Sequence, residues 1–437
     1  MLPETETPRP AFVVEDLPGP QWLRQRRAAA LERAGHLPLP TDEAEEWRYS
    51  RIAELELERY GPGPSDTPER GAVPVPAAVG EILAALGPLS GVVVLVDGRV
   101  VHSEVEGAWD AGVRFGSVHD DAVDAETVLG DPAEHPVDLF AAWNDALSVE
   151  PVVLDVPAGV TVEHPFAVVS FVQGAGIAAF PRITARLGAD AEASIVEIHL
   201  SDDVDSLVAP LTELSLGPAA RLHHAVLQDL GTSTFQVGSL VASVDRDATF
   251  DLGAAALGGD YARLRIDCRL VGRGAAGNLS SVYLGEGHQM LDLRTFQTHA
   301  APDTTSNLLF KGGVADTSHS VYTGLIRIAP DARGSNAFQT NRNVKLSDGA
   351  WAESVPNLEI ENNDVRCSHA STVGPVDPDQ RFYLESRGVP SAVADRLVVG
   401  GFFDEVLEGF AVPSLAPIIS DRLDSALDRA LGRTGAS

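Results

Sequence analysis

Residues 182–200 read RITARLGADAEASIVEIHL and hold the pattern that decides the fold. Two stretches in which apolar and polar residues alternate, ITARL and SIVEIHL, flank a segment of small residues with Gly and Asp. Alternation with period 2 is typical of a β-strand that buries one face, and Gly and Asp favour tight turns. The stretch therefore predicts a strand, a tight turn and a second strand.

The same unit recurs along the chain. Turn-forming clusters occur near residues 188, 217, 246, 274, 313, 331 and 348, so the early intervals are 29, 29 and 28 residues and the last two are 18 and 17. A loose period of this size is typical of stacked β units. An antiparallel sandwich or barrel would show the same alternation, but the long run without helical periodicity favours a β-helix, or β-solenoid.

Two helical segments are expected before the β region. The run QWLRQRRAAALERA (residues 21–34) follows Pro20 and precedes Gly35, which are typical of a helix start and a helix end. The run TDEAEEWRYSRIAEL (residues 41–55) begins with N-cap residues and has apolar residues at helical spacing, so it predicts a second helix. Residues 61–76 are rich in Pro and Gly and are interpreted as a linker.

A hairpin and a further helix complete the N-terminal region. The run VVVLVDGRVV (residues 92–101) places an Asp-Gly turn between apolar stretches, which is a strong hairpin signal. The run HPVDLFAAWNDALS (residues 135–148) predicts a helix that closes this region, with Trp143 as a core residue.

The C-terminal residues return to helical periodicity. The run from Phe382 to Phe410 has apolar side chains at helical spacing, and Pro417 opens another such segment, so the chain is expected to end in two helices. We divide the chain into an N-terminal, mainly helical domain with a small hairpin, a β-helix core and a C-terminal helical domain, at residues 1–148, 149–374 and 375–437.

The charge of the chain limits its partners. There are 63 acidic and 32 basic residues, which gives a net charge of −31 that repels phosphate backbones and anionic lipids. We therefore expect neither nucleic acid nor membrane as a partner. The N-terminus has no signal-peptide pattern and no run approaches the length of a membrane span, so a cytoplasmic protein is expected.

The stretch DVRCSHASTVG (residues 364–374) contains the residues most suited to binding a metal. If it is a strand, Cys367 and His369 project from the same face, and thiolate and imidazole are both ligands for zinc, iron or copper. Two ligands fall short of the usual four. By spacing alone, a buried thiol beside a hydrogen-bonded histidine is therefore the preferred interpretation.

The other cysteine and the remaining histidines give weaker signals. Cys268 lies in the alternating run LRIDCRL and is expected inside the β core, while the adjacent His223 and His224 would point to opposite faces of a strand. Surface or capping roles are expected for His288, His299 and His319. Two cysteines cannot hold an iron-sulfur cluster alone, so a cluster would need ligands from a second chain.

Common catalytic motifs are missing. The sequence has no P-loop, no nucleophile elbow and no H-E-x-x-H motif, so the residues for nucleotide hydrolysis, serine esterase and zincin chemistry are lacking. A stand-alone β-helix hydrolase or lyase that uses paired carboxylates on a polysaccharide stays open on fold grounds.

The C-terminal third resembles the SufB/SufD family of iron-sulfur cluster assembly proteins, and the SufD branch most closely. The resemblance rests on NLEIENNDVRCSHAS, TVG, FYLESRG, the phenylalanine pair and EVLEGF, with upstream support over residues 293–348 and weaker support from EEWRYS and AAWNDAL. The Cys-Ser-His triplet matches SufD, where SufB tends to have Glu-His-Glu-Ala. This chain departs from the family at Ala370-Ser371, where Gly-Ala is common.

The resemblance implies a right-handed parallel β-helix between helical domains, and a non-catalytic subunit of a SufBCD complex. It implies pairing with a SufB-like paralogue and docking of a SufC-like ATPase, with ATP bound by that partner. By the family pattern, His369 helps to hold a transient iron-sulfur cluster or iron at the SufB interface, and Cys367 is a secondary candidate. The region expected to dock the ATPase contains Phe382, Tyr383, Arg387, Phe402 and Phe403.

Alternatives to the SufD assignment are a SufB-type scaffold, which would bind a cluster on this chain alone, and the polysaccharide hydrolase or lyase. A homodimer of the isolated chain also stays open, because an edge built to pair with a homologue could pair with itself. The sequence does not decide the cluster type, or whether flavin takes part.

Overall fold

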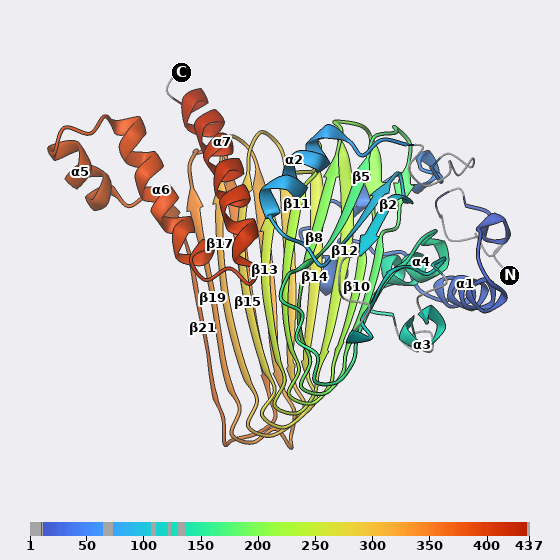
Figure 1. Ribbon diagram of the computed structural model, residues 1–437. Coiled ribbons are helices and arrows are strands. Elements are labelled where there is room, and N and C mark those ends of the chain that lie inside the picture. The colour runs from blue at the N-terminus through green and yellow to red at the C-terminus, as the bar shows by residue number, and fades with distance from the viewer. Residues whose placement is uncertain are drawn as a thin grey trace, which may run out of the picture.

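Two long β-sheets lie face to face in the computed structural model, which describes residues 10, 12–63, 73–105, 111–120, 124–129 and 136–434. From residue 211 onward the chain crosses from one sheet to the other at each turn, and each strand pairs in parallel with the strand two positions later in the chain. This is the coiling of a β-solenoid, so the predicted β-helix is confirmed (Figure 1).

The first sheet has ten strands, in the order β2 (Arg99–Val105), β1 (Gly91–Val96), β5 (Phe166–Val172), β8 (Glu192–Ser201), β11 (Arg221–Asp229), β13 (Thr249–Ala256), β15 (Ala276–Gly285), β17 (Thr305–Val314), β19 (Asn336–Lys345) and β21 (Arg366–Pro375). The second sheet has eleven. Nine follow the order β20 (Trp351–Ile360), β18 (His319–Ile328), β16 (Met290–His299), β14 (Tyr261–Leu270), β12 (Thr234–Val244), β10 (Leu211–Leu216), β7 (Arg182–Leu187), β4 (Val152–Val156) and β3 (Arg114–Ser117). The other two are β9 (Ser206–Val208), which pairs with β12, and β6 (Ala178–Ala179), which pairs with β9.

Stacked turns along one edge of the solenoid set its period. Each turn has one residue with a positive φ of 57° to 74°, at positions 190, 219, 247, 274, 303 and 334. The backbone N–H of each of these residues donates to a carbonyl of the next turn, as Asp303 does to Arg333 at 2.8 Å. Five of the six residues are Asp or Gly, which tolerate this left-handed conformation, and the sixth is Ala219.

The shorter intervals in the sequence come from turns on both edges. Residues 312–314 belong to β17, and the turn that follows them contains Asp316 on the opposite edge from Asp303 and Gly334. The intervals of 18 and 17 residues therefore measure half-coils, because they join one edge to the other.

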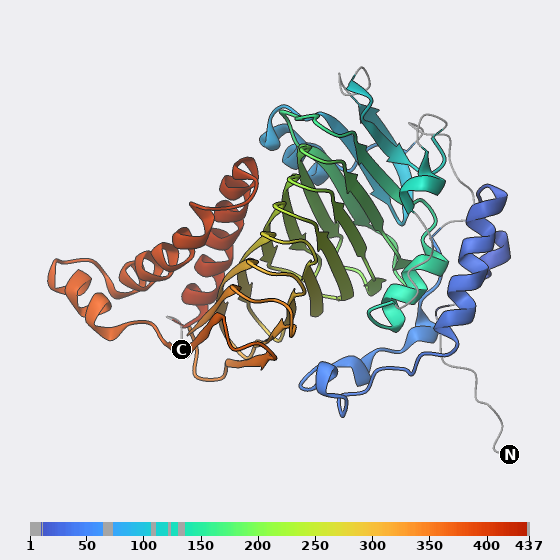
Figure 2. The ribbon, with the colours of Figure 1, turned by 90° about the horizontal axis from the view of Figure 1, so that it is seen from below.

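The core lies between the two sheets and continues on both outer faces. The interior is filled by apolar side chains such as Leu222, Phe250 and Ile266. The outer face of the first sheet is covered by α2 (Ala77–Leu86), α6 (Ser391–Leu407) and α7 (Ala416–Thr434). The outer face of the second sheet is covered by N-terminal segments that include α1 (Gln21–Ala34) and α4 (Leu139–Leu147) (Figure 2).

Most of the predicted N-terminal elements are present. Helix α1 has the predicted bounds, α4 forms within residues 135–148 with Trp143 only 2% exposed, and the Asp-Gly hairpin joins β1 to β2. The hairpin is continuous with the first sheet of the solenoid because β1 pairs in parallel with β5. Among the described residues before the solenoid, α3 (Ala125–Leu129) is a further helix.

Two expectations about the helices are wrong, and the predicted linker falls mostly outside the described residues. Residues 41–55 do not form an α-helix; they and their neighbours form the short 3₁₀ turns η2 (Glu45–Trp47), η3 (Ile52–Glu54) and η4 (Leu57–Arg59), because Trp47 and Ile52 are anchored separately on the second sheet. The chain ends in three helices, since α5 (Pro378–Ser386) is separated from α6 by Gly388 and Pro390. Most of the predicted linker, residues 64–72, lies outside the described residues.

The described residues also form the short 3₁₀ turns η1 (Val14–Asp16) and η6 (Pro413–Leu415). Among the helices in the described part of the chain, none is long and apolar enough to span a membrane.

Candidate functional site

The solenoid ends in two uncovered strands, β20 and β21, which are the last strands of the two sheets. Each has ten residues and a hydrogen-bonded neighbour on one side only. Nearly every residue of β21 is exposed, whereas the inward-facing residues of β17 and β19 are buried. Strands β20 and β21 therefore leave this end of the solenoid uncovered, and the two strands together are called the open end.

Cys367 and His369 both lie on β21 at this open end. This stretch is a strand, which was the condition for the two side chains to share a face, and the register places Cys367 beside Ala337 and His369 beside Gln339 of β19. Ala337 and Gln339 are 0% and 2% exposed and face the solenoid interior, so the thiol and the imidazole share the inward-facing side of the strand. The structure therefore brings the two predicted ligands together on one face.

The two side chains differ in environment. Cys367 is half-buried against apolar residues that include Ile326 and Ile328, and this burial raises the pKa of its thiol. A raised pKa means less thiolate, which is the form that binds metals. His369 is exposed to solvent. In the free chain the imidazole is therefore the more available ligand.

The described residues do not form a complete metal site. No group of three or more His, Cys, Asp or Glu side chains in the described part of the chain has the geometry to hold a metal ion. A thiol and an imidazole on an uncovered strand can supply two of the four ligands that iron or zinc normally takes in such sites. Any metal species bound here needs further ligands from outside the described chain.

A comparison with family models finds a match to the SufBD core domain of the SUF system for FeS cluster assembly over residues 170–402. The chain belongs to the SufB/SufD family. An iron-sulfur cluster assembly SufBD family protein of Mycobacterium tuberculosis is 35% identical over 283 residues, which are 63% of this chain and 68% of that protein. The SufD proteins of Bacillus subtilis and Escherichia coli are 25% and 26% identical, over 94% and 92% of both chains.

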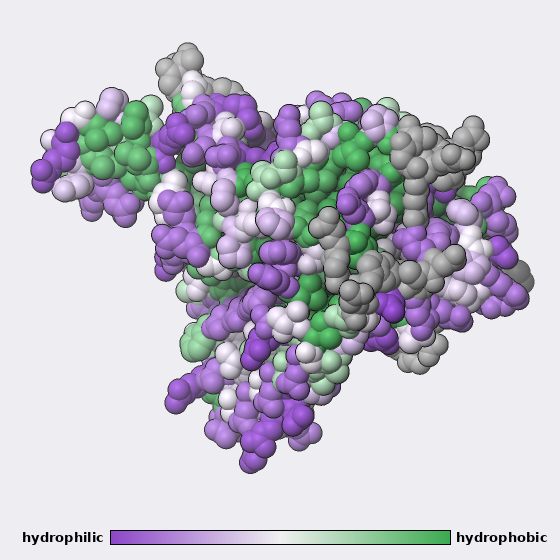
Figure 3. All heavy atoms as spheres, viewed as in Figure 1, coloured by the Kyte–Doolittle hydropathy of each residue, from purple (hydrophilic) through white to green (hydrophobic). Residues whose placement is uncertain are grey.

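The second set of predicted residues lies on a helical arm, α5 and α6, that projects beside the open end (Figure 1). Phe382 and Tyr383 of α5 are 70% and 58% exposed, and the Arg387 guanidinium lies 5.3 Å from the Tyr383 ring centre. Figure 3 shows apolar side chains gathered on this arm, where Leu397 of α6 is also 54% exposed.

The two phenylalanines of α6 have different surroundings. Phe403 is 1% exposed and packs against the first sheet near Gly313, so its expected place on a docking surface is wrong: it anchors the arm to the solenoid. Phe402 is partly buried, with the Lys311 ammonium 4.5 Å from its ring centre. Lys311 also donates to the Phe402 carbonyl at 2.6 Å and pairs with Glu405.

A cleft of ≈ 840 Å³ separates the arm from the edge of the first sheet. Its lining combines apolar side chains of the arm with charged groups from both sides, including Lys311, Arg342, Asp379, Tyr383 and Leu397. The exposed apolar surface of the arm therefore continues into a concave region.

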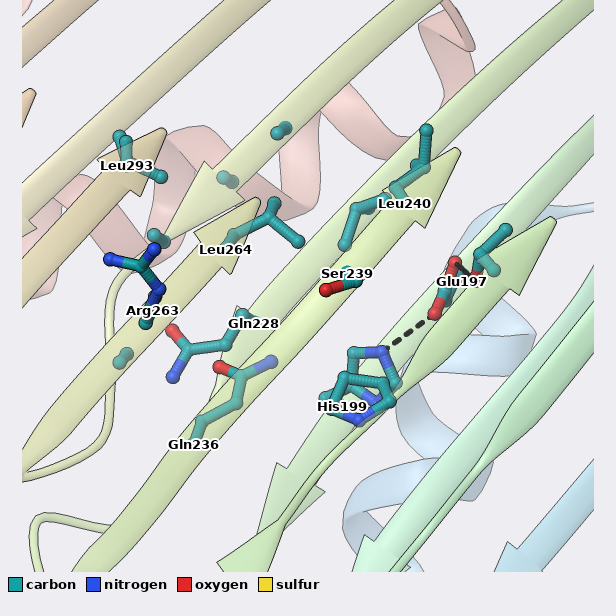
Figure 4. Close-up of a pocket in the computed structure, with 16 residues that line it drawn as sticks. Glu197, His199, Gln228, Gln236, Ser239, Leu240, Arg263, Leu264 and Leu293 are labelled. Atoms are coloured by element: carbon teal, nitrogen blue, oxygen red, sulfur yellow. Dashed lines mark hydrogen bonds and ion pairs between the residues drawn. The ribbon is translucent and has the colours of Figure 1, made fainter. Parts of the chain in front are cut away.

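A buried polar cluster inside the early coils was missed by the sequence analysis. Glu197 accepts hydrogen bonds from the Nε2 atoms of His199 at 2.8 Å and His224 at 3.0 Å, and from the Thr212 hydroxyl at 2.8 Å. Figure 4 shows Glu197 and His199 beside a cavity of ≈ 20 Å³, which has room for roughly one water molecule. Burial acts to raise the pKa of Glu197, but the two histidine hydrogen bonds outweigh it and hold that pKa well below its ordinary value.

The period of the sequence repeat could have predicted this cluster. The register pairs His224 with Ile195, 29 residues earlier, which puts His224 diagonally beside Glu197 on the neighbouring strand. His223 and His224 do point to opposite faces, as expected: His224 is 0% exposed, whereas His223 is partly exposed and pairs with Asp251 at 3.1 Å.

The other predicted side chains divide between core and surface. Cys268 is fully buried, which raises the pKa of its thiol to about 12, so the prediction of an unreactive core cysteine is confirmed. His288 and His319 are exposed. The surface role expected for His299 is wrong: it is 0% exposed, and its ring nitrogens hydrogen-bond the Thr304 and Ser306 hydroxyls at 2.8 and 2.9 Å.

Proposed function

We propose that this chain is a non-catalytic, SufD-like subunit of a complex that assembles iron-sulfur clusters, together with a SufB-like paralogue and a SufC-like ATPase. The observation that carries the proposal is an incomplete ligand pair, Cys367 and His369, on the uncovered last strand of a SufB/SufD-family solenoid. The cluster, or its iron, is transient cargo shared with the partner chain.

His369 is the leading ligand in this proposal. Its imidazole is exposed on the inward-facing side of β21, and a neutral imidazole nitrogen is a common ligand for iron. Cys367 is a secondary ligand, because burial disfavours its thiolate until a metal or a neighbouring positive charge stabilises it. The partner supplies the remaining ligands.

Pairing with the paralogue takes place at the open end. Two ten-residue strands with free edges are a template for β-pairing with another chain. Leu358, Ile360 and Val373 lie on these strands and are 39%, 43% and 43% exposed, which is apolar surface that a partner would bury. A homodimer of the isolated chain would use the same edges.

The arm is the proposed docking surface for the ATPase. Helix α5 has no buried residue, yet it carries Phe382 and Tyr383, so its apolar side chains gain burial only from another molecule. Phe402 lines the adjoining cleft, and Arg387 extends the surface with a positive charge.

The proposal is tested by co-expression with SufB-like and SufC-like partners from the same genome. We expect His369→Ala to reduce the iron and sulfide that co-purify with the complex to near background, and Cys367→Ala to reduce them less. Ser368→Ala, on the opposite face of the same strand, is the matched control. Wild-type iron content in an intact His369→Ala complex would show that His369 is not a ligand.

A SufB-type scaffold is the second candidate. It predicts that a cluster can be reconstituted on this chain alone, and the presence of only two cysteines, one of them buried in the core, argues against it. Family membership gives no support to a polysaccharide hydrolase or lyase. A cytoplasmic location is part of the proposal, and cell fractionation tests it.

A further inference from the structure

The interior of the last coils is polar directly beneath the ligand pair. On β19, the inward-facing residues Gln339, Asn341 and Asn343 are 2%, 1% and 4% exposed. The register places Gln339 beside His369, one strand further from solvent. Parallel neighbours in a sheet are about 4.8 Å apart, so the two side chains are adjacent on the inward-facing side.

The amide nitrogen and the amide oxygen of both Asn341 and Asn343 are hydrogen-bonded within the chain. Asn341 donates to the Tyr283 hydroxyl at 2.8 Å, Asn343 donates to the Asn341 oxygen at 2.8 Å, and the Tyr283 hydroxyl donates to the Asn343 oxygen at 2.7 Å. The three side chains therefore form a closed hydrogen-bonded network.

Gln339 is left out of this network. Neither its amide nitrogen nor its amide oxygen has a hydrogen-bond partner within the described chain, although both atoms are buried. Leaving a buried polar atom unpaired destabilises the folded chain. A glutamine that keeps both atoms unpaired next to an uncovered histidine therefore points to a role that is completed when the open end is occupied.

The Gln339 amide packs against Gly324 on β18 of the second sheet. A Cβ atom at Gly324 of β18 would lie 2.3 Å from the Gln339 amide nitrogen and 2.4 Å from the Tyr322 hydroxyl, so a larger residue there would displace one of these two side chains. The nitrogen is the end of the amide that lies against Gly324. The Gln339 amide oxygen accepts no hydrogen bond from the described residues.

We propose that Gln339 is a positioning residue that accepts a hydrogen bond from the ring N–H of His369 and fixes which ring nitrogen faces the cluster. This inference rests on the proposed function, in which His369 is a ligand. A neutral imidazole has one N–H and one lone pair, and a hydrogen bond to the N–H orients the lone pair of the other nitrogen. Removing such a supporting partner typically weakens metal binding about 10- to 100-fold.

The test uses the complete complex, co-expressed with its partners, and a cluster reduced for pulsed electron paramagnetic resonance. We expect Gln339→Met, which keeps the shape but removes the acceptor, to change the nitrogen hyperfine coupling and to speed cluster loss to a chelator about 10-fold. Gln339→Glu, which keeps an acceptor oxygen, should restore both.

Gln297→Met is the matched control. Gln297 is 1% exposed and its amide is also unpaired in the described chain, but it lies on β16, two strands inside the open end of the second sheet. We expect the wild-type coupling and rate of cluster loss for this variant. Equal faster loss in both variants, without a change in coupling, would overturn the inference in favour of a general packing effect.

The His369→Ala and Gln339→Met variants test the ligand role of His369 and the positioning role of Gln339 separately. If His369→Ala leaves the nitrogen coupling unchanged, His369 is not a ligand and the proposed function fails. If His369→Ala removes the coupling but Gln339→Met keeps wild-type coupling and wild-type cluster retention, only the role of Gln339 is overturned. Should Gln339→Met not assemble, Gln339→Leu and Gln339→Glu are compared in the same way.

Discussion

Individual buried polar side chains inside this solenoid are held by neighbours from the same coil or from the next one. His299 contacts hydroxyls five and seven residues away, whereas Glu197 and His224 are separated by a complete coil. Burial without an ionic partner lowers the pKa of His299 to about 4, and the histidine hydrogen bonds keep Glu197 ionised despite its burial. The fold therefore favours a neutral His299 and an ionised Glu197.

His299 should make the stability of the protein sensitive to acid. Its ordinary pKa is about 6.5, so between that pH and about 4 the unfolded chain binds a proton that the folded chain does not, and acid favours unfolding. Wild type should lose about 3 kcal/mol more than His299→Asn between pH 7 and pH 4, as measured by denaturant unfolding. The exposed His36→Asn variant is the control; parallel pH profiles for wild type and His299→Asn would contradict the assignment.

Residues at the ends of strands and helices determine where the coils turn and where helix α5 begins. The coils repeat because a left-handed turn residue at one edge of each coil hydrogen-bonds to the next turn. Helix α5 forms without a buried residue because the Asp377 carboxylate accepts from the Asp379 and Gln380 N–H groups at 2.9 and 3.3 Å, with Pro378 in the first turn. The ion pair between Arg381 and Asp395, at 3.3 Å, connects α5 to α6.

The same substitution at two glycines should change stability in opposite directions. Gly334 has φ +73° and an added Cβ would lie 2.4 Å from the Asp303 carboxylate, so Gly334→Ala should destabilise the protein by about 1 kcal/mol or more. Gly400 lies inside α6 with nothing within 4 Å of an added Cβ, so Gly400→Ala should stabilise it by about 0.5–1 kcal/mol. Thermal and denaturant unfolding measure both, and destabilisation of the same size at both sites would contradict the turn-stack explanation.

Removing the aromatic pair of α5 should weaken docking of the ATPase without unfolding the chain. Phe382→Ala combined with Tyr383→Ala removes the most exposed aromatic rings of the arm, which do not contribute to the core. We expect binding to a SufC-like partner to weaken at least about 10-fold by calorimetry, because buried aromatic anchors dominate interfaces. Val13→Ala, at a site 57% exposed and far from the arm in the chain, should bind normally. Unchanged affinity in the double variant would place the dock elsewhere.

The molecule as a whole is covered asymmetrically. Helices and N-terminal segments cover the outer faces of both sheets, and β2 and β3 are the first strands of those sheets at the other end. The open end exposes the last strands instead, with their inward-facing side chains in contact with solvent. The last coil is therefore the least buried part of the solenoid.

A charge placed on the open end should block pairing with the paralogue and leave the fold intact. Val373 is 43% exposed on β21, so Val373→Arg should change the melting temperature little but weaken heterodimer formation at least about 10-fold, because an unpaired charge would be buried on binding. Val271 is 47% exposed in a turn between β14 and β15, and Val271→Arg is the control. Sedimentation with the partner measures both, and normal pairing of Val373→Arg would exclude the open end as the interface.

The sequence by itself determined the local features of this protein. Alternation with period 2 predicted the strands and placed Cys367 and His369 on one face, and turn residues at a period of about 29 predicted the stacking. These features depend on backbone conformation over a few residues, which the local residue types encode. Only the tertiary structure decided which side chains meet across coils, as Glu197 does with His224. It also buried Phe403 while leaving Phe382 exposed, and left Gln339 unpaired beneath His369, because burial and hydrogen bonding depend on what the neighbouring coil or helix brings to the same place.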